Sequence, residues 1–230
     1  MRTPPDALML FAAGRGTRMK HLTETRPKPL IAVAGCPLID HALALVQGAQ
    51  IGRVVANTHY LGDQVAAHLA GRDVVVSEES DALLETGGGL RKALPLLGPG
   101  PVFTLNTDAA WTGPNVLQTL RAAWEPARMS ALLALVPVAA ARGYQGEGDF
   151  TLLPDGQIRR GPGYVYTGAQ ILDPAGLETI SEQAFSLNLL WNQIIAAGRA
   201  YGVVHSGGWC DVGRPDCIAL AEEMLADAAS

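Results

Sequence analysis

Short apolar runs alternate with stretches of helical period through residues 1–136 of the chain. An apolar run of strand length is typical of a strand buried on both faces, and strands that alternate with helices are typical of a parallel sheet covered by helices. The candidate strands are residues 7–12, 53–57, 74–77, 102–106 and 130–136. The pattern therefore predicts an α/β fold.

Other elements follow from turn and capping residues. Residues 38–47 should form a helix, because Pro37 precedes them, Gly48 follows them and their apolar positions form one stripe. Between residues 143 and 172, the turn sequence Pro-Asp-Gly at 154–156 separates two short strand-like runs, which predicts a hairpin and a small β-rich lobe. The remaining expected elements are a helix over 187–197, a strand over 201–205 and a helix over 215–228.

The composition suits one globular domain that is neither a nucleic-acid nor a membrane protein. A chain of 230 residues with 48% hydrophobic and 17% charged residues can form a single ordered core. The net charge is −5 and the basic residues are scattered, which argues against a nucleic-acid partner. No apolar run reaches the length of a membrane span, and no targeting segment is expected. Cys36, Cys210 and Cys217 do not have the spacing of a disulfide framework or zinc site, so we expect reduced thiols and a cytoplasmic protein.

A glycine loop follows the first predicted strand. Gly14 and Gly16 would leave backbone N–H groups open to phosphate oxygens, although a tight turn would use the same glycines. A P-loop would end in Gly-Lys-Ser/Thr, and a dinucleotide fingerprint would place a third glycine at Met19, so neither motif matches. Arg18 and Lys28 add fixed cationic donors, which suit a triphosphate better than a neutral ligand.

This loop and the segment after it resemble the signature of the sugar-1-phosphate nucleotidyltransferases. The resemblance lies in Leu10-Phe11-Ala12-Ala13-Gly14-x-Gly16-Thr17-Arg18-Met19 and in Pro27-Lys28-Pro29-Leu30. It implies a Rossmann-like, three-layer fold with a mixed, mostly parallel sheet. It also implies catalytic roles for Arg18, over the outer phosphates of a nucleoside triphosphate, and for Lys28, near the point of attack. The residues implied to bind the nucleotide are Ala12, Ala13, Gly14, Gly16, Thr17, Arg18, Lys28, Glu85, Thr86, Gly87, Gly88 and Asn106.

Two aspartates are candidates for a metal site. Asp108 follows the strand expected at 102–106, at the edge where ligands of open α/β sheets bind. Asp211, taken alone, would be interpreted as a turn or capping residue before Pro215. The resemblance implies that both hold Mg²⁺, which neutralises phosphate charge. Thr107 stands where many relatives have glycine, and it would be strained if its backbone were left-handed.

Further polar residues are candidates for base and sugar recognition. The Glu-Thr-Gly-Gly-Gly sequence from Glu85 suits either a flexible loop before a helix or close approach of a base, and the resemblance implies the second. His59 either faces the nucleotide or caps a surface turn, and we favour the surface turn. Asp149, Thr167 and Gly168 lie in the β-rich lobe and are candidates for a sugar pocket, because hydroxyl-rich ligands need polar groups.

The expected reaction is transfer of a nucleoside monophosphate to a sugar 1-phosphate, with release of pyrophosphate. The resemblance is greatest to the branch that uses UTP and N-acetylmuramate 1-phosphate in cell-wall recycling. It implies that residues 1–136 mainly bind the nucleotide, whereas 137–230 mainly bind the sugar and complete the metal site.

Three alternatives remain open. A mannose-1-phosphate guanylyltransferase, or another hexose-1-phosphate nucleotidyltransferase, would use the same reaction. A non-catalytic nucleotide-sugar sensor would be expected to lack a carboxylate or Lys28, and all three are present. A molybdenum-cofactor nucleotidylating enzyme would share the glycine loop, but not the Pro-Lys-Pro-Leu and Trp-x-Asp-Val-Gly segments together. The pattern does not predict an oligomeric state.

Overall fold

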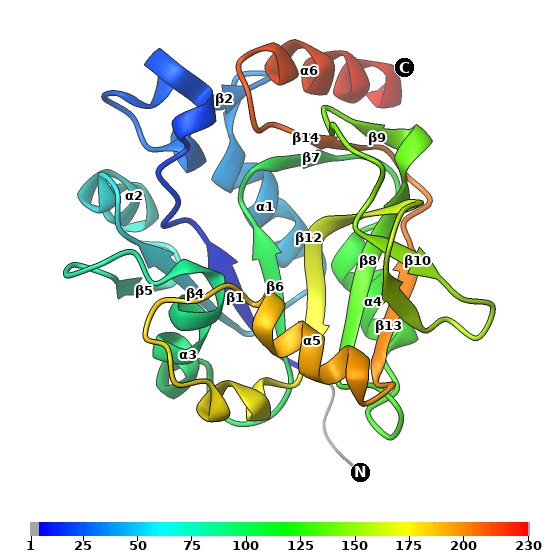
Figure 1. Ribbon diagram of the computed structural model, residues 1–230. Coiled ribbons are helices and arrows are strands. Elements are labelled where there is room, and N and C mark those ends of the chain that lie inside the picture. The colour runs from blue at the N-terminus through cyan, green and yellow to red at the C-terminus, as the bar shows by residue number, and fades with distance from the viewer. Residues whose placement is uncertain (1–4, 230) are drawn as a thin grey trace.

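A central sheet runs through the protein, with helices on both of its faces (Figure 1). The computed structural model describes residues 5–229; residues 1–4, at the start of the stretch in which no targeting segment is expected, and residue 230 lie outside it. Within the described part, the sheet has nine strands. They are β1 (Ala7–Phe11), β4 (Arg53–Thr58), β5 (Val75–Glu78), β6 (Val102–Asn106), β8 (Ala131–Pro137), β10 (Phe150–Leu152), β11 (Ile158–Arg160), β12 (Tyr164–Leu172) and β13 (Ala200–Val204).

The order of the strands places the first one near the centre. β1 lies between β4 and β6 and is parallel to both, and β5 is parallel to β4. β12 is antiparallel to β6 and β8, and β13 is parallel to β8. The predicted hairpin is present as β10 and β11, and β10 joins it to the main sheet through β12. The mixed sheet is therefore confirmed, and the carboxyl ends of β1, β4 and β6 meet at one edge.

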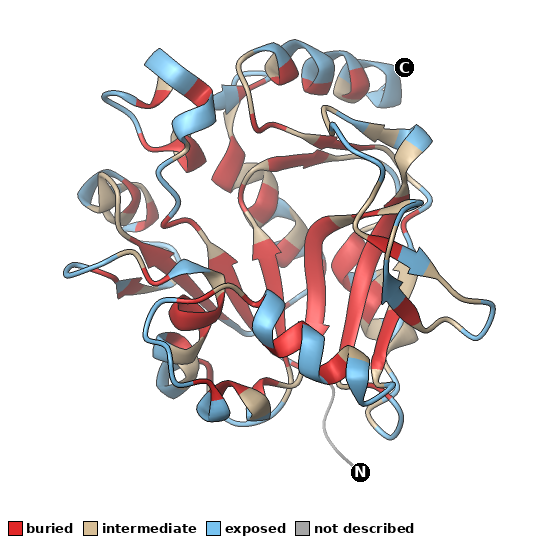
Figure 2. Ribbon diagram, viewed as in Figure 1, coloured by how far each residue is buried: buried red, intermediate tan, exposed pale blue. Residues whose placement is uncertain are grey.

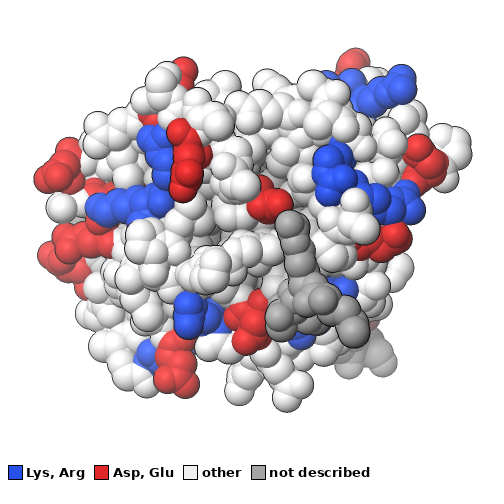
Figure 3. Space-filling model, turned by 90° about the horizontal axis from the view of Figure 1, so that it is seen from below, with Lys and Arg blue, Asp and Glu red and all other residues white. Residues whose placement is uncertain are grey.

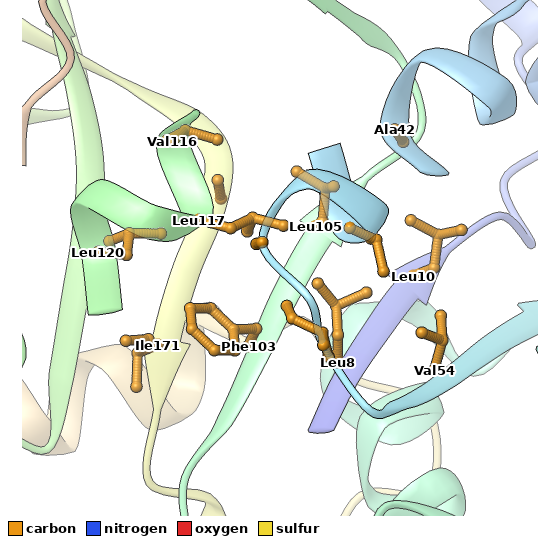
Figure 4. Packing of buried hydrophobic residues seen from close by; sticks show 14 of the residues in the cluster. Leu8, Leu10, Ala42, Val54, Phe103, Leu105, Val116, Leu117, Leu120 and Ile171 are labelled. Atoms are coloured by element: carbon orange, nitrogen blue, oxygen red, sulfur yellow. The ribbon is translucent and has the colours of Figure 1, made fainter. Parts of the chain in front are cut away.

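Alternating side chains of the strands supply two hydrophobic layers. Leu8 and Leu10 of β1 point to one layer and Met9 to the other, as the two-residue period of a strand requires. Figure 2 shows this buried centre, and Figure 4 shows Phe103 of β6 packed in the same layer as Leu8. The first layer includes α1 (Leu38–Gly48), α2 (Gly62–Leu69) and α4 (Val116–Ala123), and the second includes α3 (Glu85–Leu97) and α5 (Asn188–Ala196). The predicted three-layer arrangement is confirmed.

A smaller three-stranded sheet, which the sequence did not predict, lies at the top of Figure 1. It consists of β7 (Ala109–Trp111), β14 (Trp209–Asp211) and β9 (Ala141–Arg142), and α6 (Asp216–Ala229) packs on it. A hydrophobic cluster that contains Met19, Cys210 and Met224 joins it to the glycine loop. The remaining elements are β2 (Ala32–Val33), β3 (Cys36–Pro37) and the 3₁₀ helices Thr17–Thr23, Lys28–Leu30, Val138–Ala140 and Pro174–Thr179.

The segment from Glu85, for which a flexible loop was one of the two interpretations, is the first turn of α3. Its three glycines are helical because each lets a neighbouring group come close: an added Cβ would lie only 2.3 to 2.6 Å from another atom. The nearest groups are the Phe185 ring at Gly87, the Gln183 carbonyl at Gly88 and the Glu79 carboxylate at Gly89. Tertiary packing therefore outweighs the low helix propensity of glycine, which is about 1 kcal/mol per residue.

The surface carries charges of both signs. On the face that Figure 3 shows, Lys and Arg side chains are interspersed with Asp and Glu. In the described part of the chain, no helix combines the length and the apolar character needed to cross a membrane.

Removal of the Phe103 ring should strongly destabilise the fold. Phe103 is fully buried on a central strand, so Phe103→Ala should lower the free energy of unfolding by about 3–5 kcal/mol. Chemical denaturation monitored by circular dichroism measures this change. Leu96→Ala, at a side chain that is 40% exposed on α3, is the control and should change stability by no more than about 0.5 kcal/mol. Equal effects of the two changes would contradict the assignment of Phe103 to the core.

Candidate active site

Two adjoining cavities open at the carboxyl ends of the central strands. The glycine-loop cavity, of about 340 Å³, is lined by Phe11, Ala12, Ala13, Gly14, Lys28, Pro29, Asn57, Leu83, Glu85, Thr86, Asn106, Thr107, Asp108 and Ser186. The aromatic cavity, of about 380 Å³, is lined by Arg18, Asn106, Asp108, Tyr144, Gln145, Val165, Tyr166, Thr167, Gly168, Trp209, Asp211 and Arg214. Asn106 and Asp108, at the end of β6, are common to both linings and mark their junction.

A larger hollow of about 640 Å³ lies elsewhere, beside Asp6, Arg53 and Pro101. It is at the amino ends of the parallel strands, whereas ligands of open α/β sheets bind at the carboxyl ends. None of the predicted site residues lines it. We therefore place the site in the two smaller cavities.

The glycine loop forms one wall of the glycine-loop cavity. Asn57 Oδ1, at the end of β4, accepts a hydrogen bond of 2.9 Å from the Ala12 N–H and so fixes the start of the loop. Gly14 faces open space, because an added Cβ would have no neighbour within 4 Å. Gly16 has φ +62, and an added Cβ there would lie 2.8 Å from Lys28 Cβ. Gly16 therefore allows the turn of the loop and the approach of Lys28. Thr17 is exposed and starts a 3₁₀ helix, outside both linings.

An ion pair between Lys28 and Asp108 lies where the two cavities meet. Lys28 Nζ is 2.9 Å from Asp108 Oδ2, and the Lys28 side chain is only 11% exposed. Burial by itself would raise the pKa of the Asp108 carboxyl, but the charge and hydrogen bond of Lys28, with the charge of Arg18, hold this pKa below its ordinary value. Asp108 is therefore ionised at neutral pH.

The small sheet brings Asp211 next to Asp108. In the pairing of β14 with β7, Asp211 lies opposite Ala109, and the Val212 N–H donates a 2.8 Å hydrogen bond to the Asp108 carbonyl. Burial raises the pKa of the Asp211 carboxyl, and the negative charge of Asp108 raises it further. Two carboxylates thus repel each other at the cavity junction, and a cation between them would relieve this repulsion.

Arg18 completes the charged cluster. Gly213 lies between it and Asp211: an added Cβ at Gly213 would be 3.1 Å from Arg18 Nη2 and 2.9 Å from Asp211 Oδ2. Among residues 5–229, the Arg18 guanidinium has no hydrogen-bonded or ion-paired partner, and its side chain lines the aromatic cavity. It is available to bind an anionic ligand.

The donor set at this junction suits a hard divalent cation. Asp108 and Asp211 offer carboxylate oxygens, and no group of three or more His, Cys, Asp and Glu side chains suited to a metal is found in the described residues. Zinc sites normally use three or four protein ligands, whereas Mg²⁺ is held by one or two carboxylates together with water and substrate phosphates. The residues therefore fit a cation that is bound jointly with a phosphorylated ligand.

The start of α3 forms a further wall, although not in the way the sequence implied. Glu85, at φ +59, and Thr86 line the glycine-loop cavity. Gly87 and Gly88 do not: their N–H groups donate to the Phe185 carbonyl at 2.8 and 3.2 Å. These two glycines, which the resemblance implies bind the nucleotide, lie outside the lining of the cavity and pack against the segment at Phe185.

The predicted sugar residues have different positions relative to the aromatic cavity. Thr167 and Gly168 line it, and the Thr167 hydroxyl donates to the Ala134 carbonyl at 2.7 Å. Asp149 lies outside the lining: its Oδ2 accepts a 2.8 Å hydrogen bond from the Tyr166 N–H, and Tyr144 Oη donates to Oδ1 at 3.5 Å. Asp149 thus supports two residues that do line the cavity.

The sequence left open whether Thr107 is strained and what His59 contacts. Thr107 is not among the residues with positive φ, so it is not strained, and its hydroxyl donates to the Phe11 carbonyl at 2.7 Å. His59 Nδ1 lies 2.6 Å from the Glu79 carbonyl, and His59 lines neither cavity. The side chain thus has a local partner, and the capping of a surface turn stays the favoured interpretation for His59.

Sequence reasoning missed several residues of the cavities. Asn57 stands at the carboxyl end of a predicted strand. Ligands of open α/β sheets bind at these strand ends, and Asn57 could therefore have been singled out on the same ground as Asp108. Tyr144, Tyr166 and Arg214 carry no such signal, because the small sheet and the irregular pairing of β12 with β8 bring them together. Burial raises the pKa of Tyr166, and the charge of Asp108 adds to this, so its phenol stays protonated.

Comparisons with known proteins identify the family of the chain. Residues 8–153 match the model of the MobA-like NTP transferase domain. The chain is 40% identical, over 99% of its length and 100% of the relative, to an N-acetylmuramate alpha-1-phosphate uridylyltransferase of Caulobacter vibrioides. It is 35% identical to the protein of the same name from Neisseria meningitidis, over 89% of this chain and 92% of that one.

Solved structures with low sequence identity share the fold. HddC from Yersinia pseudotuberculosis, in complex with GMP-PN, matches with a TM-score of 0.76 at 18% identity over 95% of this chain and 99% of that one. The inositol-1-phosphate CTP transferase from T. maritima matches with a TM-score of 0.77 at 16% identity over 100% and 98%. On these sequence matches, the chain belongs to the nucleotidyltransferase family that has the MobA-like NTP transferase domain and includes the N-acetylmuramate alpha-1-phosphate uridylyltransferases.

Proposed function

We propose that this nucleotidyltransferase joins UMP, from UTP, to N-acetylmuramate 1-phosphate and releases pyrophosphate, with Mg²⁺ as its metal. The observation that carries the proposal is the convergence of Lys28, Asp108, Asp211 and Arg18 at the junction of two cavities. Two substrates that react through their phosphates need adjoining pockets with charge-neutralising groups between them. A non-catalytic sensor would not need this arrangement.

Each cavity is assigned to one substrate. The glycine-loop cavity takes UTP, because the loop backbone and Lys28 can bind its phosphates while Glu85 and Thr86 lie near its base and ribose. The aromatic cavity takes the sugar 1-phosphate, because Tyr144, Tyr166 and Trp209 line it with aromatic rings, against which a sugar ring can pack.

Asp108 and Asp211 would hold Mg²⁺. When bound, the metal supplies neutralisation of the negative charge on the reacting phosphates. The low pKa of Asp108 and its position beside Asp211 support this assignment.

The protein residues then act by position and charge. An oxygen of the acceptor phosphate attacks the α-phosphorus of UTP, a new P–O bond forms, and the bond to the β-phosphate oxygen breaks. Lys28, whose ammonium lies beside Asp108, stabilises the charge that develops on the α-phosphate. Arg18, which has no partner of its own among residues 5–229, holds the departing pyrophosphate. The attack passes directly from one substrate to the other, without a covalent enzyme intermediate.

The two uridylyltransferases at 40% and 35% identity support UTP and N-acetylmuramate 1-phosphate as the substrates. This choice places the protein in cell-wall recycling. The three free cysteines, two of them buried, and the use of a nucleoside triphosphate support a location in the cytoplasm.

The test is a pyrophosphate-release assay of UTP, GTP, CTP and ATP against a panel of sugar 1-phosphates with Mg²⁺. We expect the highest kcat/KM for UTP with N-acetylmuramate 1-phosphate. A preference for GTP with mannose 1-phosphate would replace this assignment, and no turnover with any pair would reject the enzyme proposal.

Loss of either metal-site carboxylate should abolish turnover. Asp108→Asn and Asp211→Asn each remove a negative charge that the metal needs, so we expect kcat to fall at least about a hundredfold in each variant. Asp227→Asn is the control, since among residues 5–229 the Asp227 carboxylate forms an exposed ion pair with Arg142 and no other, and it should keep nearly full activity. A variant that folds and retains normal kcat would exclude that aspartate from the metal site.

A methyl group on Gly16 should weaken UTP binding. Gly16→Ala is strained at φ +62 and would also press on Lys28, so we expect KM for UTP to rise about tenfold, equivalent to about 1.4 kcal/mol. Gly35→Ala is a matched control: Gly35 has φ +74, but an added Cβ there would meet nothing within 4 Å. Steady-state kinetics should show an unchanged KM for UTP in this control. Similar increases in both variants would mean that the Lys28 contact does not matter.

A further inference from the structure

A buried chain of hydrogen bonds passes behind the glycine-loop cavity. The Ala12 N–H donates to Asn57 Oδ1 at 2.9 Å, Asn57 Nδ2 donates to Glu79 Oε1 at 2.7 Å, and the Leu84 N–H donates to Glu79 Oε2 at 2.9 Å. Glu79 is 1% exposed and Asn57 is 3% exposed. Glu79 makes no ion pair among the described residues, so neutral N–H groups satisfy this buried carboxylate.

These hydrogen bonds connect three separate walls of the glycine-loop cavity. Ala12 belongs to the loop after β1, Asn57 to the end of β4, and Leu84 directly precedes the start of α3. Glu79 itself follows β5 and is not among the residues that line the glycine-loop cavity; it lines a separate hollow, with Asp81 and Leu84. It therefore touches none of the space proposed for the nucleotide, but it holds the segments that do.

The order of donors and acceptors along these hydrogen bonds requires a carboxylate at position 57 or position 79. Both ends are backbone N–H donors, at Ala12 and Leu84, whereas the Asn57 amide has one donor and one acceptor. If position 79 also carried an amide, two donors would face each other at one of three contacts, whichever way the two amides were turned. These contacts are the one with the Ala12 N–H, the one between the two amides and the one with the Leu84 N–H. An ionised carboxylate avoids this conflict, because both of its oxygens accept.

The packing around Glu79 is adapted to this carboxylate. An added Cβ at Gly89 would lie 2.6 Å from Glu79 Oε1 and 2.9 Å from Asn57 Nδ2, so the third glycine of α3 leaves room for the pair. The positive end of the α3 dipole lies at Leu84 and favours a negative charge beside it. These contacts account for Gly89, to which the proposed mechanism assigns no role.

We infer that Glu79 is a positioning residue for the donor nucleotide: through Asn57 and Leu84 it sets the glycine loop and the start of α3 at the separation that the nucleotide needs. This inference rests on the proposed use of the glycine-loop cavity for UTP. Removal of the Glu79 carboxylate should weaken the binding of UTP and leave the binding of the sugar 1-phosphate unchanged, since these hydrogen bonds do not reach the aromatic cavity.

The test compares Glu79→Gln with a double variant in which the amide and the carboxylate exchange places, Asn57→Asp with Glu79→Gln. In the double variant, the carboxylate at position 57 can accept from the Ala12 N–H and from the amide nitrogen at position 79. The amide oxygen at position 79 then accepts from the Leu84 N–H, so the polarity is restored. Titration calorimetry with UTP and Mg²⁺, and KM values for both substrates, measure the functional effect. Amide hydrogen exchange at Ala12 and Leu84 in the ligand-free protein measures the hydrogen bonds themselves.

For Glu79→Gln we expect the Kd for UTP to rise about tenfold, KM for the sugar 1-phosphate to stay within about twofold, and exchange at Ala12 or Leu84 to accelerate. The double variant should recover the slow exchange at Ala12 and Leu84. It should also bind UTP more tightly than the single variant does. Glu78→Gln, at an exposed neighbour on β5, is the matched control and should behave as the wild type.

Wild-type exchange and UTP affinity in Glu79→Gln would overturn the inference, as would a double variant no better than the single one. If Glu79→Gln does not fold, the double variant decides: folding with slow exchange at Ala12 and Leu84 supports the polarity requirement, and failure to fold rejects it. The two proposals fail differently, because a wild type without turnover removes the proposed function, whereas the exchange measurement needs no substrate.

Discussion

The ion pair between Lys28 and Asp108 is the interaction on which the site depends. It joins the segment after the glycine loop to the end of β6, and it does so at the boundary between the two cavities. With the Lys28 side chain 11% exposed, the ammonium is held in place, and the pKa of Asp108 stays low despite burial. Gly16 is necessary for the same geometry, because a side chain there would displace Lys28. A cation and an anion are thus fixed side by side before any ligand binds, which is the preorganisation that phosphoryl-group chemistry uses.

Much of the fold could be predicted from local sequence patterns. The predicted strands in turn indicated which residues lie at the edge of the sheet. The five strands and the first helix were predictable because apolar runs, Pro37 and Gly48 act within a few residues of the elements they define. Lys28 and Asp108 were predictable as site residues, and the structure brings them into contact. The small sheet was not predictable, because its strands are two or three residues long and come from three distant parts of the chain.

The features of α3 that the sequence did not show have a common physical cause. Three consecutive glycines indicate a loop when only propensity is considered, yet here they mark a helix whose first turn lies against other groups. The partners, Phe185 and Glu79 among them, are distant in sequence or on another element, so no local pattern reveals them. The same limit applies to Asp149, a candidate for the sugar pocket, whose carboxylate accepts a hydrogen bond from the Tyr166 N–H and lies outside the lining of the aromatic cavity. In both cases the residue type was informative, but its partner was decided by tertiary contacts.

Three carboxylates in and behind the site differ in their hydrogen-bond and ion-pair partners, and this difference separates their roles. Glu79 is satisfied by two neutral N–H donors and is closed to ligands. Asp108 is satisfied by the Lys28 ammonium but remains 32% exposed to the cavities. For Asp211 no hydrogen-bond or ion-pair partner of the carboxylate is found among residues 5–229, and burial together with Asp108 raises its pKa. A carboxylate that is partly buried, unpaired and beside another negative charge is stabilised either by protonation or by a bound cation. Asp211 keeps a raised pKa although the charges of Lys28, Arg18 and Arg214 act to lower it, so a cation bound beside it would stabilise its ionised form.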